Sequence, residues 1–264
     1  MNLPKLCILI PVFRDQHGLI RTLEVLAGFD DPFDIVVVDD GSPQPIHCDA
    51  QYGDHRVTLH RLDRNQGIEH ALNAGLELIL ERGHAFVGRL DCGDLPLPGR
   101  FARQLDFLQA NPKTGMVGTW ARCVDDDGRY LFTLRFPTDH GAIMRYQRYV
   151  PALLHPTIMI RTEALREIGL YSDRYRTAED YDLFIRMGQR WQLANIPEVL
   201  TEYIVSDTGT TAAKRKRNLV SRFRIQRDNF APADIHSWAG LARTAIFMVI
   251  PFDWLTAIKK RAWK

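Results

Sequence analysis

The first half of the chain alternates short, continuously apolar runs with segments whose apolar residues recur at helical spacing. We predict a strand for each apolar run, at residues 6–12, 35–38, 57–62 and 85–90. Apolar residues at helical spacing predict helices from Leu19 to Ala27 and over residues 67–80. Continuously apolar strands separated by helices indicate βαβ units and a mostly parallel central sheet flanked by helices, which is an α/β fold.

The second half is less regular and contains the signals of a hairpin. Residues 116–124 and 130–135 predict two strands joined by an acidic turn that ends in Gly128. Further predictions are a strand over 153–161, helices over 162–168 and 179–190, and an extended segment over 196–205. We expect one domain over residues 1–210 that joins a donor half to an acceptor half, followed by a helical extension over 211–264.

The extension is basic first and apolar afterwards. Residues 214–229 are strongly basic with helical spacing, and residues 238–258 are mostly apolar and precede a basic end. Apolar and aromatic residues beside clustered lysine and arginine are typical of a helix that lies in a membrane surface. The alternative is a helix that packs on the domain or on a second subunit. The extension therefore predicts a peripheral membrane contact or a homodimer contact.

Composition and charge exclude several classes of function. The chain has 264 residues, of which 45% are hydrophobic and 25% charged, which is enough to bury a core. A formal net charge of +2 gives no general attraction to nucleic acid, so no nucleic-acid partner is predicted. The four cysteines are scattered without zinc-ligand spacing, which favours a reducing, cytoplasmic location. No uncharged run is long enough for a simple membrane span.

Two acidic turns follow predicted strands, where ligands of parallel sheets bind. They are Asp39-Asp40 and the Asp91-Cys92-Gly93-Asp94 run. Carboxylates at such turns can accept hydrogen bonds from a nucleoside, or hold a divalent cation that neutralises a diphosphate leaving group. Aspartate and glycine are also ordinary turn residues, so a structural role for each turn stays open.

A third acidic cluster, Glu179-Asp180-Tyr181-Asp182, opens a predicted helix. Sugar transfer by direct displacement needs one base to take the proton of the acceptor hydroxyl, and a carboxylate at a helix start can serve. Acids are favoured in the first turn of any helix, so Asp182 in particular can be an ordinary helix acid.

The order of the motifs along the chain resembles that of the family-two glycosyltransferases. The motifs are Leu9-Ile-Pro-Val-Phe13, Val36-Val-Val-Asp-Asp-Gly-Ser42, Asn65-Gln-Gly67 with Asn73, Arg89-Leu-Asp91 with Asp94, Pro98-Gly-Arg100 with Gln104, His155-Pro-Thr157 with Arg161, and Glu179-Asp180-Tyr-Asp182. The resemblance covers about residues 4–205. It implies the GT-A nucleotide-diphospho-sugar transferase fold and a mostly inverting class of enzyme.

On the donor side, the resemblance assigns five residues. Pro11 and Phe13 match the first-strand motif that lies against the nucleotide. Asp40 matches the aspartate that binds the base, and Asp91 matches the first acid of the motif for metal and nucleotide. Arg64 is a weaker candidate for contact with the base or a phosphate.

On the acceptor side, the resemblance assigns Asp180 as the catalytic base. Glu179 stands beside Asp180 and is expected on the acceptor side of the site. His155 is expected on the same side, with a structural histidine as the equal alternative.

Two departures from the family pattern concern the metal. Gly93 stands where the metal-binding acid is expected, while Asp94 follows one position later. A Tyr-Arg-x-His motif, frequent in the family, is replaced by the sequence from Tyr203 to Asp207. We therefore predict a hydrated, weakly held Mg²⁺ or Mn²⁺ near Asp91 and Asp94.

The predicted function is inverting transfer of a sugar from a nucleoside-diphosphate sugar, a uridine one, to a glycan or lipid-linked acceptor. The predicted setting is bacterial cell-surface polysaccharide synthesis, including lipopolysaccharide, at the cytoplasmic face of the inner membrane. One alternative is a sugar nucleotidyltransferase, which would want a glycine-rich loop where this chain has Phe13-Arg14-Asp15-Gln16. Another is a non-catalytic nucleotide-sugar-binding module with a degenerate metal site.

Overall fold

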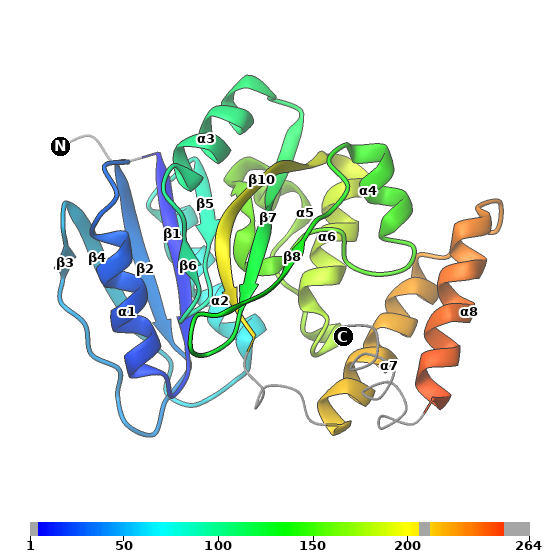
Figure 1. The fold of residues 1–264 in the computed structure, drawn as a ribbon, viewed down its shortest axis with the longest axis horizontal. Coiled ribbons are helices and arrows are strands. Elements are labelled where there is room, and N and C mark those ends of the chain that lie inside the picture. The colour runs from blue at the N-terminus through cyan, green and yellow to red at the C-terminus, as the bar shows by residue number, and fades with distance from the viewer. Residues whose placement is uncertain (1–4, 206–211, 251–264) are drawn as a thin grey trace.

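The structure is a computed structural model that describes residues 5–205 and 212–250 (Figure 1). Its described residues form a sheet with the strand order β3-β4-β2-β1-β5-β9-β7-β10-β6, and β8 pairs with β7 off this path. The strands are β1 (Leu6–Val12), β2 (Phe33–Asp39), β3 (Gln51–Tyr52), β4 (His55–Arg61), β5 (Phe86–Arg89), β6 (Leu95–Pro96), β7 (Thr114–Val124), β8 (Tyr130–Leu134), β9 (Met159–Arg161) and β10 (Gln192–Ile204).

Most long strands run in the same direction. β4, β2, β1 and β5 are parallel neighbours, and β7 is parallel to β10. β9 lies antiparallel between β5 and β7, so the two parallel groups share one direction. The carboxyl ends of β1, β2, β4, β5, β7 and β10 therefore meet at one edge of the sheet, as the sequence predicts for a mostly parallel α/β fold.

Helices cover both faces of the sheet. They are α1 (Gln16–Leu26), α2 (Ile68–Glu81), α3 (Arg100–Ala110), α4 (His140–Tyr146), α5 (Thr162–Ile168), α6 (Glu179–Arg190), α7 (Ala212–Asp228) and α8 (Ile235–Val249), with the 3₁₀ turns η1 (His155–Thr157) and η2 (Asp173–Tyr175).

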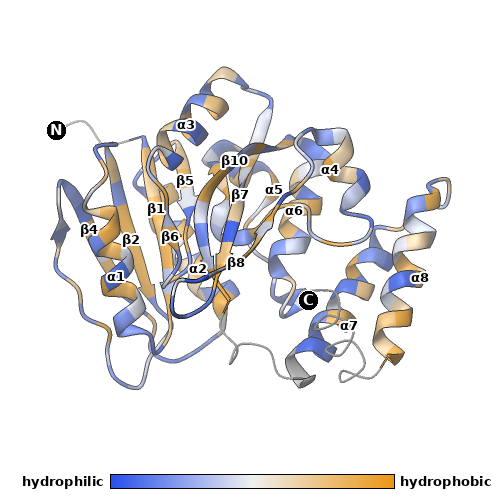
Figure 2. Ribbon diagram, in the orientation of Figure 1, coloured by the Kyte–Doolittle hydropathy of each residue, from blue (hydrophilic) through white to orange (hydrophobic). Residues whose placement is uncertain are grey.

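The alternation of side chains along β1 explains the two layers. Leu6, Ile8 and Ile10 pack with α1 and α3, whereas Cys7 and Leu9 pack with α2, α5 and α6. A strand that is apolar on both faces needs a helical layer on each. Figure 2 shows this apolar character along β1 and β2.

The expected strand over residues 153–161 is wrong in its first half. Only Met159–Arg161 form a strand, and residues 155–157 form the 3₁₀ turn η1. Pro156 lacks a backbone N–H to donate to a neighbouring strand, and the Thr157 hydroxyl donates to Leu154 O at 2.8 Å, which closes the turn. Helix α4, capped by Asp139, was not among the predicted elements.

The extension packs on the rest of the chain. Ser221 Oγ of α7 donates to Arg176 O at 2.7 Å, and Arg148 forms an ion pair with Asp234, the N-cap of α8. A Cβ atom added to Gly240 would lie 1.9 Å from Arg148 O, so α8 approaches the domain very closely. The domain boundary at residue 210 stays a prediction, since residues 206–211 lie outside the described ranges.

Helix α8 ends sooner than the apolar pattern predicts. Its last residue is Val249, and Ile250 has an extended backbone (φ −72°, ψ 125°), as expected for a residue that precedes a proline in the sequence. The remainder of the predicted segment and the basic end lie outside the described residues. No helix within residues 5–205 and 212–250 has the length and apolar character needed to cross a bilayer.

Candidate functional site

A cavity of about 330 Å³ opens at the carboxyl ends of β1, β2 and β5. Pro11, Phe13, Asp40 and Asp91, four of the residues expected on the donor side, line it together. Phe13 is 38% exposed, which leaves its ring accessible to a ligand. The parallel strands bring these residues together because each one stands at the end of its strand.

Asp40 connects the end of β2 to the start of α2. Its carboxylate accepts hydrogen bonds from Asn65 Nδ2 and Gln66 N at 2.8 Å and from Gly67 N at 3.1 Å. Burial raises the pKa of Asp40, while the backbone donors of Gln66 and Gly67 lower it. Asp40 therefore shapes this wall of the cavity through contacts within the chain, and its contact with a base stays a prediction.

Asp39, the preceding acid, holds the turn itself. It accepts hydrogen bonds from Ser42 N at 2.9 Å and Ile46 N at 3.3 Å, and it pairs with Arg61. Burial alone would raise the pKa of Asp39, but these donors hold it below the usual value. The turn interpretation fits Asp39, whereas Asp40 faces the cavity.

Arg64 lies in the segment after β4, with its backbone against Gly41. A Cβ atom on Gly41 would lie 2.2 Å from Arg64 C. The Arg64 side chain is exposed, and Arg64 is not among the described residues that line the donor-side cavity. Its contact with a donor stays a prediction.

Arg89 is the residue that the assignment of site residues missed. Its guanidinium is buried, and Nη2 lies 2.5 Å from Asp91 Oδ1. Nε and Nη1 have no hydrogen-bond partner within the described part of the chain. A charged residue at the end of a strand that is otherwise buried was the available signal, because a buried arginine needs an anionic partner.

Asp94 is more buried than its place in an acidic turn suggests. It is 4% exposed, Oδ1 accepts from Ile204 N at 3.0 Å, and Oδ2 has no hydrogen-bond partner among the described residues. Burial and then the charge of Asp91 raise the pKa of Asp94 to about 8.

The residues present fit a divalent cation only in part. Gly93 adopts a positive φ of 97° and offers no ligand, and Asp91 spends one oxygen on Arg89. Within the described ranges, no group of three or more histidine, cysteine or acidic side chains is arranged to hold a metal ion. Asp91 and Asp94 do line one cavity of about 550 Å³ together with Asp15. Two carboxylates suit a hydrated cation whose remaining ligands come from donor phosphates.

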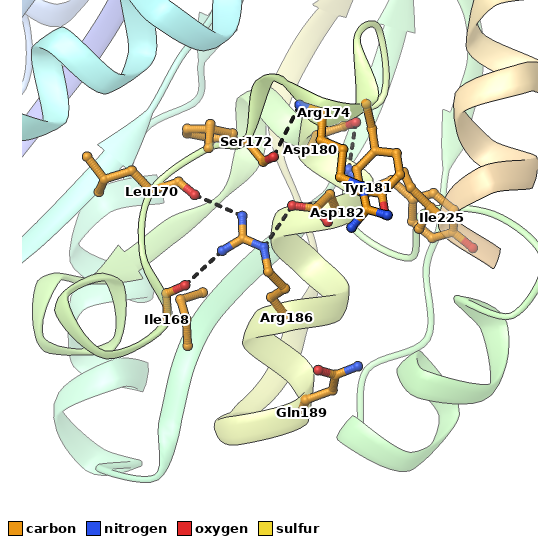
Figure 3. Close-up of polar contacts among 12 residues, drawn as sticks. Ile168, Leu170, Ser172, Arg174, Asp180, Tyr181, Asp182, Arg186, Gln189 and Ile225 are labelled. Carbon is orange, nitrogen blue, oxygen red and sulfur yellow. Dashed lines mark hydrogen bonds and ion pairs between the residues drawn. The ribbon is translucent and has the colours of Figure 1, made fainter. Parts of the chain in front are cut away.

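Glu179 and Asp180 begin α6, and Asp180 Oδ1 accepts from Tyr181 N at 2.8 Å (Figure 3). Burial raises the pKa of both carboxyl groups, and for Glu179, with the Asp180 charge added, to about 7. The positive charge of Arg89 lowers the pKa of each. Arg89 thus pairs with Asp91 and lowers the pKa of Glu179 and Asp180, but neither of these two acids is among the described residues that line the donor-side cavity.

A second arginine fixes the start of α6. Arg186 Nε lies 2.7 Å from Asp182 Oδ2, and its other nitrogens donate to Ile168 O at 2.9 Å and Leu170 O at 2.8 Å (Figure 3). Asp182 is buried and held in this ion pair, so it is a structural acid rather than a solvated one. The pair anchors the helix turn that presents Asp180.

His155 is buried beneath the site. Its Nε2 lies 2.7 Å from the hydroxyl of Tyr171, and burial lowers the pKa of His155 well below its usual value. Asn73 exchanges two hydrogen bonds with the Tyr171 backbone, at 2.8 and 2.9 Å. This network favours the structural alternative for His155, and its contact with an acceptor stays a prediction.

Known proteins resemble this chain in sequence and in fold. The family model described as "Glycosyl transferase family 2" matches residues 7–169. The amylovoran biosynthesis glycosyltransferase AmsE of Erwinia amylovora is 31% identical over 140 residues, which are 53% of this chain and 51% of the relative. The putative glycosyltransferase EpsE of Bacillus subtilis is 26% identical over 69% of this chain and 66% of its own length. The chain thus spans about half the length of the Erwinia relative.

Solved structures share the fold. TarS 1–349 of S. aureus, in complex with UDP, has a TM-score of 0.64 and 17% identity, with 91% of this chain and 70% of that chain covered. The mannosyltransferase PcManGT of Pyrobaculum calidifontis, in complex with GDP-Man and Mn²⁺, has a TM-score of 0.63 and 18% identity, with 99% and 81% covered.

Proposed function

The chain belongs to glycosyl transferase family 2, and on this premise we propose that it transfers a sugar from a nucleoside-diphosphate sugar to an acceptor hydroxyl with inversion. The observation that supports this most is the position of Arg89. It pairs with Asp91 beside the donor-side cavity and acts on the carboxyl groups of Glu179 and Asp180. In this proposal Arg89 links the donor-binding acid, Asp91, to the base for the acceptor, Asp180.

In this proposal, transfer occurs in a single displacement. Asp180 takes the proton of the acceptor hydroxyl, whose oxygen forms a bond to the anomeric carbon. The bond from that carbon to the diphosphate oxygen breaks on the opposite face, and the nucleoside diphosphate leaves with the electron pair. Because the attack comes from the face opposite the leaving group, the anomeric configuration inverts.

The donor is proposed to bind in the cavity lined by Pro11, Phe13, Asp40 and Asp91. Phe13 offers an exposed ring against which a base can stack, and Asp40 lies beside it at the cavity wall. The complexes of TarS with UDP and of PcManGT with GDP-Man support a nucleoside-diphosphate donor. We propose a uridine nucleotide, with Arg64 reaching its base or phosphate.

A divalent cation is proposed to be held by Asp91, with Asp94 beside it. When bound, it would neutralise the diphosphate charge as the glycosidic bond breaks. The Mn²⁺ in the PcManGT complex supports this chemistry. Arg89 holds Asp91 in position for it.

Removal of the cation should abolish transfer, because the charge of the leaving diphosphate is then no longer neutralised. A chelator can remove it, because two carboxylates hold it weakly without the donor phosphates. We expect nucleotide release to stop in excess EDTA and to return on addition of Mn²⁺ or Mg²⁺. Binding of UDP, measured by calorimetry with and without Mn²⁺, should tighten with the metal. Full activity in the chelator would refute the metal proposal and leave Arg89 as the cation beside the diphosphate.

The proposed setting is cell-surface polysaccharide synthesis on a glycan or lipid-linked acceptor at the cytoplasmic face of the inner membrane. The biosynthetic role in the name of the Erwinia relative supports this setting. Exposed apolar residues of α8, among them Trp238 and Val249, support a peripheral membrane contact.

The replacement Asp180→Asn tests the catalytic assignment. A panel of nucleotide sugars first identifies the donor by nucleotide release in the presence of acceptor. The variant should then lower kcat by about 10²- to 10⁴-fold, because a general base is lost, while nucleotide affinity is kept. Glu163→Gln, at an exposed acid in the first turn of α5, is the matched control and should keep full activity.

Near-normal turnover of Asp180→Asn would overturn the catalytic assignment. Nucleotide binding without any release, across the whole panel and in the wild-type chain, would instead identify a non-catalytic binding module.

A further inference from the structure

A second cavity, of about 790 Å³, adjoins the donor-side cavity across the start of α2. The two cavities share Asn65, Gly67 and Ile68 as lining residues. The far wall of the larger cavity consists of Arg176 and Thr177, from the segment after η2, and of Arg215, Arg217 and Asn218 from α7. It therefore lies between the domain and the helical extension.

Hydrogen bonds across the extension place these arginines together. Asn218 Nδ2 donates to Thr177 O at 2.5 Å, and Ser221 Oγ donates to Arg176 O at 2.7 Å. Thr177 adopts a positive φ of 67°, a conformation that is strained for a β-branched residue. Such strain is retained only where the surrounding structure fixes the backbone, and it concentrates at binding sites.

The opposite wall is also favourable to an anion. Helix α2 begins after Gly67 without a side-chain cap from that residue, so the positive end of its dipole lies at this wall, where the Asp40 carboxylate already accepts from Gln66 N and Gly67 N. One acid, Glu69, lines this wall, and its Oε2 would lie 2.8 Å from a Cβ atom on Gly67. Among the described residues that line the cavity, the three arginines outnumber the one acid, Glu69, so the lining carries a net positive charge.

Two of the residues that line the cavity are related to the catalytic candidates. Thr177 precedes Asp180 by three positions in the chain, and Glu69 is among the charges that raise the pKa of Glu179. Asp91, beside which the donor diphosphate is proposed, is not among the described residues that line the larger cavity.

We propose that this cavity is an acceptor subsite that binds a phosphate or diphosphate group of the acceptor through Arg176, Arg215 and Arg217. The subsite rests on the proposed transferase function, because it gives the acceptor of that reaction its chemical class. Arginine suits this ligand because its fork of N–H donors pairs with two phosphate oxygens at once. Arg215 also donates to Phe247 O at 3.4 Å, which connects the subsite to the apolar end of α8.

The test uses inorganic pyrophosphate as the probe and the full chain. Pyrophosphate binding is measured by calorimetry while the donor-side cavity is saturated with UDP. The double replacement Arg176→Gln and Arg217→Gln should weaken pyrophosphate binding by about tenfold or more, because two charge-assisted contacts are lost. Arg176 and Arg217 also line a neighbouring cavity, which Arg224 of the same helix lines without lining the proposed subsite. Arg224→Gln removes this exposed arginine, so the control should stay within about twofold of wild type if pyrophosphate binds in the subsite.

Three results would overturn the proposal. They are the absence of pyrophosphate binding in the wild-type chain, displacement of pyrophosphate by UDP, and an equal loss of affinity in Arg224→Gln. Displacement by UDP would assign the arginines to the donor diphosphate, and the equal loss would assign the binding to net charge. Each of these measurements is made without turnover, so a failure of the transferase proposal is seen separately in the assay of nucleotide release.

A second probe identifies the source of the phosphate. Geranyl diphosphate should bind more tightly than inorganic pyrophosphate if the acceptor is lipid-linked, because its chain can lie on the apolar residues of α8. Equal affinities would assign the subsite to a phosphate-bearing glycan. Both outcomes support an anionic acceptor.

Discussion

Neighbouring acids in this protein have different environments and therefore different tasks. Asp39 is held ionised by the donors of its own turn, whereas Asp40 joins that turn to α2. Glu179 is buried and Asp180 half-buried at the start of α6, and one backbone N–H and the charge of Arg89 offset the desolvation of the pair. The pair thus stores electrostatic strain where a base is needed.

The strain at Glu179 predicts a dependence of stability on pH. The pKa of Glu179 is raised from 4.5 to about 7 in the folded state. The unfolded chain loses this proton at lower pH than the folded one, so the folded state loses stability as the pH rises from about 4.5 to about 7. Glu179→Gln removes the ionisation, and we expect it to stabilise the protein by about 2 to 3 kcal/mol at pH 8 and by little at pH 4.5. Thermal unfolding at both values of pH measures the difference.

Glu163→Gln is the control for this measurement, since its side chain is exposed. An effect of Glu179→Gln that is equal at both pH values would mean that Glu179 is not protonated in the folded state near neutral pH.

At the scale of elements, the turn after β2 depends on a close approach between two chain segments. Gly41 has a φ of 62°, and a Cβ atom there would lie 2.2 Å from Arg64 C and 2.5 Å from Arg64 Cα. The clash is with backbone, so side-chain movement cannot relieve it. This contact places Asp40 within reach of residues 65–67.

Gly41→Ala should therefore disturb the donor-side cavity. We expect a loss of stability of about 3 kcal/mol, from left-handed backbone strain together with overpacking, and at least about tenfold weaker UDP binding. Gly128→Ala is the matched control, because Gly128 has a φ of 79° with nothing within 4 Å of the added Cβ atom. It isolates the backbone strain, about 1 to 2 kcal/mol. Equal losses in the two variants would show that the turn can move away from Arg64.

At the scale of the whole molecule, α7 lines the proposed acceptor subsite, while α8 presents an exposed apolar surface. One side of α8 packs on Arg148 through Gly240, and the other side carries Ile246 and Val249, which are 55% and 79% exposed. Figure 2 shows the apolar end of this helix. The packing of α8 on Arg148 fits the alternative that the extension packs on the domain. The exposed Ile246 and Val249 are the residues through which we propose membrane contact.

The double replacement Ile246→Ser and Val249→Ser should weaken binding to vesicles that contain phosphatidylglycerol by about tenfold, because buried aliphatic area is lost at the lipid surface. Co-sedimentation with vesicles measures this. Leu131→Ser, at an apolar residue of β8 that is 39% exposed, should leave vesicle binding unchanged. Unchanged binding of the double variant, with a change of oligomeric state instead, would assign this face to a second subunit.

The sequence alone determined the features that depend on local period and order. The buried strands, the helices between them and the acids at the strand ends follow from side-chain alternation and turn chemistry, and Glu179–Arg190 matches its predicted bounds. The motif series placed the chain in its family before any fold was known. Local sequence patterns determine these features because residues that are close in the sequence stay close in any fold.

Only the tertiary structure decided which charges share an environment. Arg89 receives its role from Asp91 and from acids on α6, and the arginines of the proposed acceptor subsite come from segments well separated in the chain. The burial that raises the pKa of Asp94 and Glu179 is likewise set by packing from distant elements. Electrostatic energy depends on the distance between charges in space and on the exclusion of water, and neither quantity can be read from the amino-acid sequence.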